Sequence, residues 1–294
     1  MNSAREKGRV GLIGIGAMGF AMARNLIQRG YPVAVRDIRE SVEEDARAHG
    51  MMVCGSPGEV AEACDPTLIV VVNAAQIDSV INGADGIARA RVAGRTVILC
   101  STIAPSDAAR FAEQLAACAV QTIDGPISGG PARAADGSMS MMLAGSDSAL
   151  VPWGALLADM AEKRFRVGTH HGDAAKAKLV NNLLAGINLV AAAEALALGM
   201  KLGLEPAMLY AVISASSGSS WVFQDRMRRA IDSDFHPRAA THILTKDVGL
   251  ALDLAQGLDH ETPLGRAALE RLCSTIAGGW GDLDDAAVIN TYLD

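Results

Sequence analysis

The sequence predicts an α/β fold, with a Rossmann-like N-terminal domain built on a parallel-rich sheet and an all-α C-terminal domain joined to it by a long helix. Three observations predict it. β-rich runs alternate with helix-length segments through the first half, a glycine-rich turn follows the first run, and strand-like runs disappear after about Gly172. Such alternation is typical of a parallel sheet with helices on both faces. We expect the domains to be residues 1–168 and 169–294.

The strands are predicted from short runs rich in β-branched residues. Five runs are each followed by a helix-length segment: Val10–Ile13, Val33–Val35, Leu68–Val72, Thr96–Cys100 and Val120–Asp124. Two later apolar runs extend the predicted sheet: Ser140–Leu143 and Arg164–Val167. Helix periodicity dominates the second half. There, Asp173 to about Leu202 is predicted as one helix of roughly 30 residues, or about 45 Å, which would form the spine of the second domain and contribute to a dimer interface.

Composition and charge narrow the class of protein. The formal net charge of −7 over 294 residues argues against nucleic-acid or anionic-membrane partners, because both would repel the chain. The five cysteines form no C-x-x-C pair, the six histidines show no metal-site spacing, and Met1–Arg9 has no apolar export segment. The apolar stretch Leu183–Met200 is interrupted by Asn188 and Glu194, which favours a buried helix. We expect a cytoplasmic protein with a small-molecule partner and no metal.

A dinucleotide-binding motif follows the first predicted strand. Gly14-Ile15-Gly16-Ala17-Met18-Gly19 has the spacing G-x-G-x-x-G, in which the glycines permit a tight turn, close approach of a pyrophosphate and close helix packing. The helix predicted from Ala17 would direct its N–H groups at the phosphates. A plain strand-to-helix turn is the alternative interpretation.

An acidic residue follows the second predicted strand. Asp37 stands 21 residues after Gly16, near the distance at which an acid binds the adenosine ribose diol. This favours NAD over NADP. Arg36 and Arg39 flank the acid and are the residues that would instead hold a 2′-phosphate.

Three further strand ends are candidates for ligand contacts, because ligands of parallel sheets bind at the carboxyl ends of the strands. They are Val72-Asn73, Ser101-Thr102 and the loop Asp124–Pro131. Within that loop, the consecutive N–H groups of Ser128-Gly129-Gly130 can form a nest for a carboxylate. A flexible turn is the alternative.

The long predicted helix carries a candidate proton-transfer residue. Lys178, Asn181 and Asn182 share one side of the helix, whereas Lys176 lies about 200° away. A helical lysine is most often a solvated surface charge. Lys178, with an asparagine four residues on and at a domain junction, is our candidate for an acid/base, and we expect it at an exposed position in a cleft.

Four stretches together resemble the β-hydroxyacid dehydrogenase family, which includes 3-hydroxyisobutyrate dehydrogenase, tartronate semialdehyde reductase and 6-phosphogluconate dehydrogenase. They are Gly11–Gly19, Asp124–Gly130, Gly172–Asn182 and Lys246-Asp247, in the family's order. The resemblance covers essentially the whole chain. It implies an NAD-dependent hydroxyacid dehydrogenase with an NAD-binding N-terminal domain, and a substrate held beside the nicotinamide between the two domains.

The resemblance also implies roles for individual residues. Lys178 would be the general acid/base, Asn182 would hold the substrate, and Ser128, Gly129 and Gly130 would take its carboxylate. Four residues match positions that contact NAD: Val72, Asn73, Thr102 and Lys246. Thr102 is expected to contact the substrate as well.

Within the family, three segments look most like members that act on L-threonate: Val70–Gln76, Ser219–Phe223 and Asp284–Ile289. We therefore predict oxidation of L-threonate to its 2-oxo acid by a homodimer or homotetramer associating through the helical domain. Asn181-Asn182 departs from this subgroup, in which we expect a His-Gln pair. The departure keeps open a 3-hydroxyisobutyrate dehydrogenase or a tartronate semialdehyde reductase. A non-catalytic NAD-binding sensor is a more distant alternative.

Overall fold

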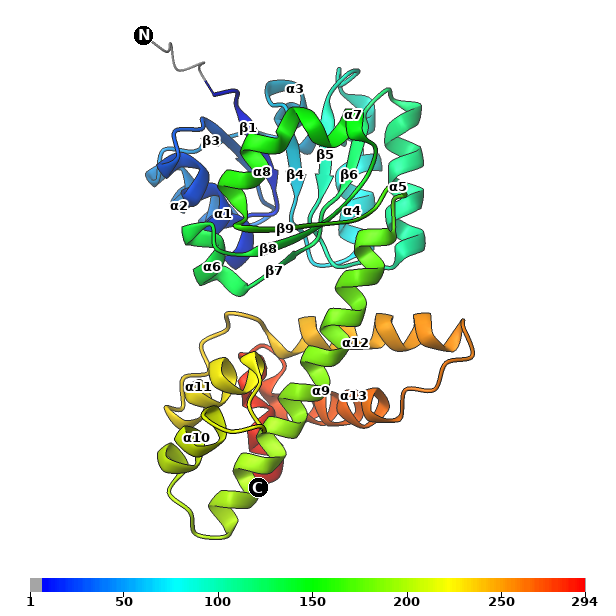
Figure 1. The fold of residues 1–294 in the computed structure, drawn as a ribbon. Coiled ribbons are helices and arrows are strands. Elements are labelled where there is room, and N and C mark those ends of the chain that lie inside the picture. Colours follow the sequence, from blue (N-terminus) through cyan, green and yellow to red (C-terminus); the bar gives the residue numbers. More distant parts are fainter. Residues whose placement is uncertain (1–6, 294) are drawn as a thin grey trace. The chain divides into compact units, whose positions relative to one another are not determined.

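The computed structural model describes residues 7–293. The chain forms two compact units, the first ending at Lys178 and the second beginning at Leu179. This boundary falls within α9 (Asp173–Lys201), the single long helix that was predicted. In Figure 1 the α/β unit runs from blue to green and the helical unit from green to red.

The first unit is built on a mixed sheet, which has nine strands within residues 7–178. The strands are β1 (Val10–Ile13), β2 (Val33–Arg36), β3 (Met52–Val53), β4 (Thr67–Ile69), β5 (Thr96–Leu99), β6 (Gln121–Asp124), β7 (Ile127–Ser128), β8 (Ser140–Ala144) and β9 (Lys163–Gly168). Six of them are parallel in the order β3-β2-β1-β4-β5-β6, which is the strand order of a Rossmann fold. β8 is antiparallel to β6, and β9 is parallel to β8.

Helices cover both faces of this sheet (Figure 1). They are α1 (Ala17–Gln28), α2 (Glu40–Ala48), α3 (Pro57–Ala63), α4 (Ala74–Asn82), η1 (Ile87–Arg89), α5 (Pro105–Ala117), α6 (Gly130–Asp136), α7 (Asp147–Leu150), η2 (Val151–Trp153) and α8 (Gly154–Met160). Successive strand side chains point to opposite faces. Leu12 and Ile98 accordingly lie in the core beneath α1, α6 and α8, while Ile13 and Leu99 lie in the core beneath α3, α4 and α5. The predicted fold class of this domain is confirmed.

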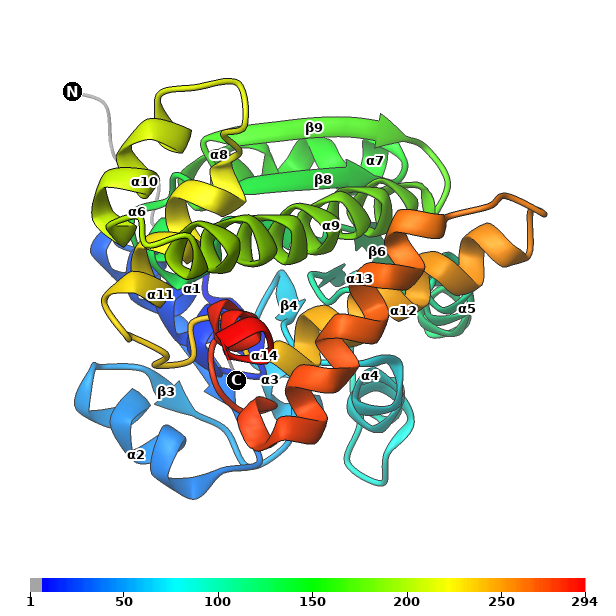
Figure 2. The ribbon, with the colours of Figure 1, turned by 90° about the horizontal axis from the view of Figure 1, so that it is seen from below.

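The second unit is all-helical in its described residues, 179–293. After α9 come α10 (Pro206–Ser214), η3 (Phe223–Met227), α11 (Arg228–Ile231), α12 (Thr241–Gln256), α13 (Pro263–Thr275), η4 (Ile276–Trp280), η5 (Asp285–Ile289) and α14 (Asn290–Leu293). Helices α12 and α13 run side by side (Figure 2). The core contains Leu189 and Leu196 of α9 with Phe223, Val248 and Leu272. By composition α9 is apolar enough to cross a membrane, but so are core helices of water-soluble proteins.

The predicted strands differ from the observed ones mainly at their ends. The run Leu68–Val72 was expected to be a strand throughout, but β4 ends at Ile69. The reason is that Asn73 begins a helix, since its side chain caps α4 by accepting a hydrogen bond from the Gln76 N–H. The two-residue strands β3 and β7 were not predicted, because two residues show no periodicity.

Candidate functional site

The first glycine of the motif occupies a position that other residues cannot take without strain. Gly14 has φ +87° and follows β1, and its N–H donates to the carbonyl oxygen of Arg36 at 2.9 Å. A Cβ atom here would lie 2.6 Å from the carbonyl oxygen of Val70. The turn therefore lies against the loop after β4, where the strand order of the sheet reverses. This crevice is where open α/β sheets bind ligands.

The other two glycines fit the arrangement needed for a pyrophosphate. A Cβ on Gly19 would overlap the carbonyl oxygen of Gly14, so α1 packs as closely on β1 as glycine allows. Gly16 precedes α1, and within the described residues no side chain caps this helix end. Helix N–H groups without a side-chain cap favour an anion. The turn of residues 14–19 thus fits a dinucleotide.

Asp37 is a buried carboxylate directly beside this turn. Its Oδ2 accepts a hydrogen bond from the Ile15 N–H at 2.9 Å, and its Oδ1 accepts from the backbone N–H and the Nε of Arg39 at 3.0 and 2.9 Å. Burial alone would raise the pKa of Asp37, but the hydrogen bonds from Arg39 outweigh it and hold the pKa below its usual value. Asp37 is therefore ionised at neutral pH.

The loops after β4 and β5 contain three of the predicted contact residues. The side chain of Asn73 is engaged as the α4 cap, and Gln76 accepts a hydrogen bond from the Val72 N–H at 2.8 Å. Thr102 is half-buried in the turn between β5 and α5. Beside it, the Ser101 hydroxyl accepts from the Val71 N–H at 3.0 Å and so joins the two loops.

The predicted carboxylate loop has a conformation that requires its two glycines. Ser128 ends β7 and Gly130 begins α6. Gly129 and Gly130 have φ +137° and +75°, which residues with a Cβ rarely adopt. All three residues are partly exposed. Their binding of a carboxylate stays a prediction.

The start of α9 is fixed by Asp124, the last residue of β6. Its Oδ2 accepts hydrogen bonds from the N–H groups of Gly172, Ala174 and Ala175 at 2.8, 3.1 and 3.2 Å. Burial raises the pKa of Asp124, and these three bonds act against the increase. Asp124 belongs to one of the stretches that carry the family resemblance, but nothing in the sequence indicates this contact.

The two lysines of α9 have different surroundings. Lys178 is buried, with 7% of its surface exposed, whereas the Lys176 side chain is 58% exposed and pairs with Asp173 at 2.9 Å. The helix geometry predicted this separation. Our expectation from the sequence that Lys178 is an exposed position is wrong, because its side of α9 is covered.

In the helical unit, Asp247 joins two predicted site residues. Its Oδ2 accepts from the Asn182 side-chain amide at 2.6 Å, and its Oδ1 pairs with the Lys246 ammonium at 2.6 Å. Asn181 in turn donates to Asn182 Oδ1 at 3.0 Å. Asp247 and Asn182 are both buried. The sequence placed Asp247 next to Lys246 but could not show its contact with a residue 65 positions away.

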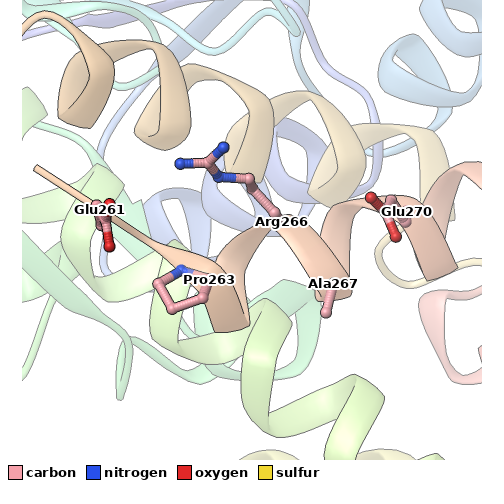
Figure 3. Close-up of a pocket in the computed structure, with 5 residues that line it drawn as sticks. All are labelled: Glu261, Pro263, Arg266, Ala267 and Glu270. Atoms are coloured by element: carbon pink, nitrogen blue, oxygen red, sulfur yellow. The ribbon is translucent and has the colours of Figure 1, made fainter.

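Two other features of the helical unit lie outside this set. A shallow surface pocket at the start of α13 is lined by Glu261, Pro263, Arg266, Ala267 and Glu270 (Figure 3), none of which is a predicted site residue. In the segment Ser219–Phe223, the ring of Phe223 is buried and stacks on Tyr210, while Trp221 is exposed.

Comparisons with known proteins agree with this arrangement. Residues 9–168 match the family described as the NAD binding domain of 6-phosphogluconate dehydrogenase. Residues 172–292 match the family described as NAD-binding of NADP-dependent 3-hydroxyisobutyrate dehydrogenase.

Individual relatives are similar over nearly the full length. The chain is 40% identical to L-threonate dehydrogenase of Cupriavidus necator, over 96% of this chain and 95% of that protein. It is 36% identical to L-threonate dehydrogenase of Escherichia coli, over 96% and 94%. Among solved structures, 3-hydroxyisobutyrate dehydrogenase from Salmonella typhimurium superposes with a TM-score of 0.89 at 35% identity, covering 96% of this chain and 99% of that one.

Proposed function

The chain belongs to the NAD-dependent β-hydroxyacid dehydrogenase family, and from that premise we propose that it oxidises L-threonate to the 2-oxo acid with Lys178 as general acid/base. The observation that carries the catalytic assignment is the burial of Lys178 on a helix whose first turn is fixed to the sheet. Lys176, two residues away, is exposed and ion-paired. The choice of L-threonate rests on the similarity to the two L-threonate dehydrogenases described above.

The reaction divides between proton and hydride transfer. When bound, NAD would supply the acceptor for the hydride that leaves C2 of the substrate. The neutral amine of Lys178 takes the proton of the C2 hydroxyl as the carbonyl forms, and in the reverse direction the ammonium donates it. Positioning matters because proton transfer requires the two heavy atoms to come within about 3 Å.

Two groups of hydrogen-bond donors would orient the substrate. The N–H groups of Ser128, Gly129 and Gly130 would bind the carboxylate. The Asn182 amide directs one of its two N–H donors to Asp247, which leaves the second to bond a substrate oxygen. The charge of Asp247 fixes which end of the amide faces it. Asn182 stands one helical turn beyond Lys178, a spacing suited to two contacts on a four-carbon acid.

NAD is the favoured cofactor because the ionised Asp37 can accept both ribose hydroxyls and would repel a 2′-phosphate. Both neighbouring arginines are engaged with carboxylates. Arg39 pairs with Asp37 at 2.9 Å, and Arg36 with Glu43 at 2.6 Å. Val72, Asn73, Thr102 and Lys246 complete the proposed cofactor contacts.

We also propose a cytoplasmic homodimer or homotetramer formed by the helical domain. Several apolar side chains of this domain are more than half exposed, among them Val180, Leu184 and Leu198 of α9 and Met208 of α10. Large exposed apolar side chains that gather on one face of a domain are typical of an interface. Light scattering that returns the mass of a single chain at micromolar concentration would contradict this assembly.

Two other enzyme functions are supported by specific observations. The Asn181-Asn182 pair and the similarity to a solved 3-hydroxyisobutyrate dehydrogenase favour that activity, or a tartronate semialdehyde reductase, as the alternative. A non-catalytic NAD sensor would have no need of a buried Lys178.

A substrate panel separates these functions. Purified protein is assayed at the nicotinamide absorbance band with L-threonate, D-erythronate, 3-hydroxyisobutyrate and glycerate, and with tartronate semialdehyde in the reductive direction, each with NAD and with NADP. We expect the highest kcat/KM for L-threonate with NAD. Turnover of 3-hydroxyisobutyrate without activity on the four-carbon sugar acids L-threonate and D-erythronate would overturn the proposed substrate. Preference for NADP would overturn the role of Asp37, and inactivity on every compound would support the sensor.

A further inference from the structure

The first turn of α9 is held by an acceptor that lies far away in the sequence. The first N–H groups of a helix have no partner within the helix, and a capping side chain usually comes from the residue just before it. Here the acceptor is Asp124 Oδ2, which is 48 to 51 residues earlier and belongs to β6. The start of α9 is thereby tied to the carboxyl end of a sheet strand.

Two further contacts fix the same segment. The His171 ring Nε2 is 2.9 Å from the carbonyl oxygen of Thr122, also on β6. Gly172 has φ +102°, and a Cβ there would lie 2.8 Å from the carbonyl oxygen of Pro105. Residues 171–175 are therefore seated on β6 and on the start of α5. Lys178 follows Ala174 by four residues, or about 6 Å along the helix axis.

Asp124 also begins the segment that leads to the proposed carboxylate loop, since Ser128 follows it by four residues. One carboxylate therefore joins the element that carries the acid/base to the element that would hold the substrate carboxylate. We propose that Asp124 is a positioning residue for Lys178, setting where α9 begins and hence where the amine lies relative to the substrate loop. This inference rests on the proposed function.

The chemistry of the contact favours a carboxylate at this position. Three N–H groups converge on one oxygen atom. An amide oxygen has two lone pairs and no formal charge, so asparagine would hold the turn less well than aspartate and better than alanine. A graded series of substitutions should consequently give a graded displacement of Lys178.

The test is a double-mutant cycle between Asp124 and Lys178. Because a displacement of about 1 Å at a reacting group can cost 100-fold in rate, we expect Asp124→Ala to lower kcat roughly 10- to 100-fold, and Asp124→Asn to recover part of that loss. NAD binding, measured by calorimetry, should change less than about 2-fold, because the turn of residues 14–19 is untouched. In the Lys178→Ala background, Asp124→Ala should cause almost no further loss of the residual turnover.

The control is Asp173→Asn, which removes a carboxylate at the same helix end. Asp173 pairs with Lys176 and accepts from the His170 N–H, and it has no part in the proposed chemistry. It should leave kcat within about 2-fold. Thermal unfolding identifies any variant that fails to fold. If Asp124→Ala does not fold, Asp124→Asn replaces it in the double-mutant cycle.

Each outcome has a definite meaning. Equal loss from the Asp124 substitution in both backgrounds, or loss of NAD binding in parallel with kcat, overturns the inference and leaves the role of Lys178 intact. Full turnover by Lys178→Ala overturns the proposed function and this inference together.

Discussion

The two domains hold their candidate site residues in different ways. In the sheet domain the turn of residues 14–19, which would bind the cofactor (the cofactor turn), is shaped by the backbone, through the positive φ of Gly14 and the close approach of Gly19 to it. In the helical domain Asn182 and Lys246 are held by a side chain, the buried Asp247. A turn defined by backbone conformation has a sequence pattern, here the glycine spacing, that can be recognised. A contact between distant side chains has no such pattern, because folding alone brings the partners together.

This comparison predicts that cofactor binding and turnover can be lost separately. The largest effect is expected for Lys178→Ala, which should lower turnover about 100-fold or more, the range for loss of a general acid/base. NAD affinity should stay unchanged in calorimetry, because Lys178 is not among the proposed cofactor contacts. Since Lys178 is buried, Lys178→Met, which keeps the apolar stem, distinguishes lost chemistry from a lost packing contact.

Lys176→Ala is the matched control for this substitution. Lys176 is on the same helix, exposed and paired with Asp173, and its removal should leave turnover near normal. Loss of turnover in the Lys176 variant with retention in the Lys178 variant would show that the wrong face of α9 was assigned.

The next largest effect is expected for a substitution in the turn of residues 14–19. In Gly19→Ala the new methyl group must displace the Gly14 carbonyl, and overpacking of this kind costs about 2 kcal/mol. Because the displaced carbonyl changes the shape of the turn that would hold the pyrophosphate, we expect the NAD affinity to fall about 30-fold, or about 2 kcal/mol of binding free energy, with a smaller change in turnover at saturating NAD. Gly154→Ala is the control, because a Cβ at Gly154 has no neighbouring atom within 4 Å. Equal NAD affinity in the two variants would contradict a backbone-defined cofactor turn.

The smallest effect should come from removing the Asp247 carboxylate, which contacts Asn182 and Lys246. Asp247→Ala leaves Asn182 and Lys246 without their shared acceptor, and we expect turnover to fall about 10-fold and the substrate KM to rise. Asp253→Ala removes an exposed aspartate from the same helix, α12, and should be silent. If steady-state kinetics gave the two variants the same constants, Asp247 would have no part in orienting the site.

Local patterns in the sequence determined much of the first domain and the length of the spine helix. The spacing of Gly14, Gly16 and Gly19 and the position of Asp37 express requirements within one strand–turn–helix–strand unit, so a single stretch of sequence contains them. The end of α9 was likewise predictable, because Gly203 and Pro206 follow closely after it in the sequence. The family was recognisable because four such local motifs occur in order, and the comparisons confirm it.

Only the tertiary structure decided which polar groups meet. Asp124 reaches α9 across 48 residues, and Asn182 reaches Asp247 across 65; neither distance has a periodicity that could predict it. The burial of Lys178 was also missed, since helix geometry gives the face on which a side chain lies but not what covers that face. The local conformational preferences of residues can be read from neighbouring positions in the sequence, whereas contacts between distant segments depend on how the sheet and the helices pack.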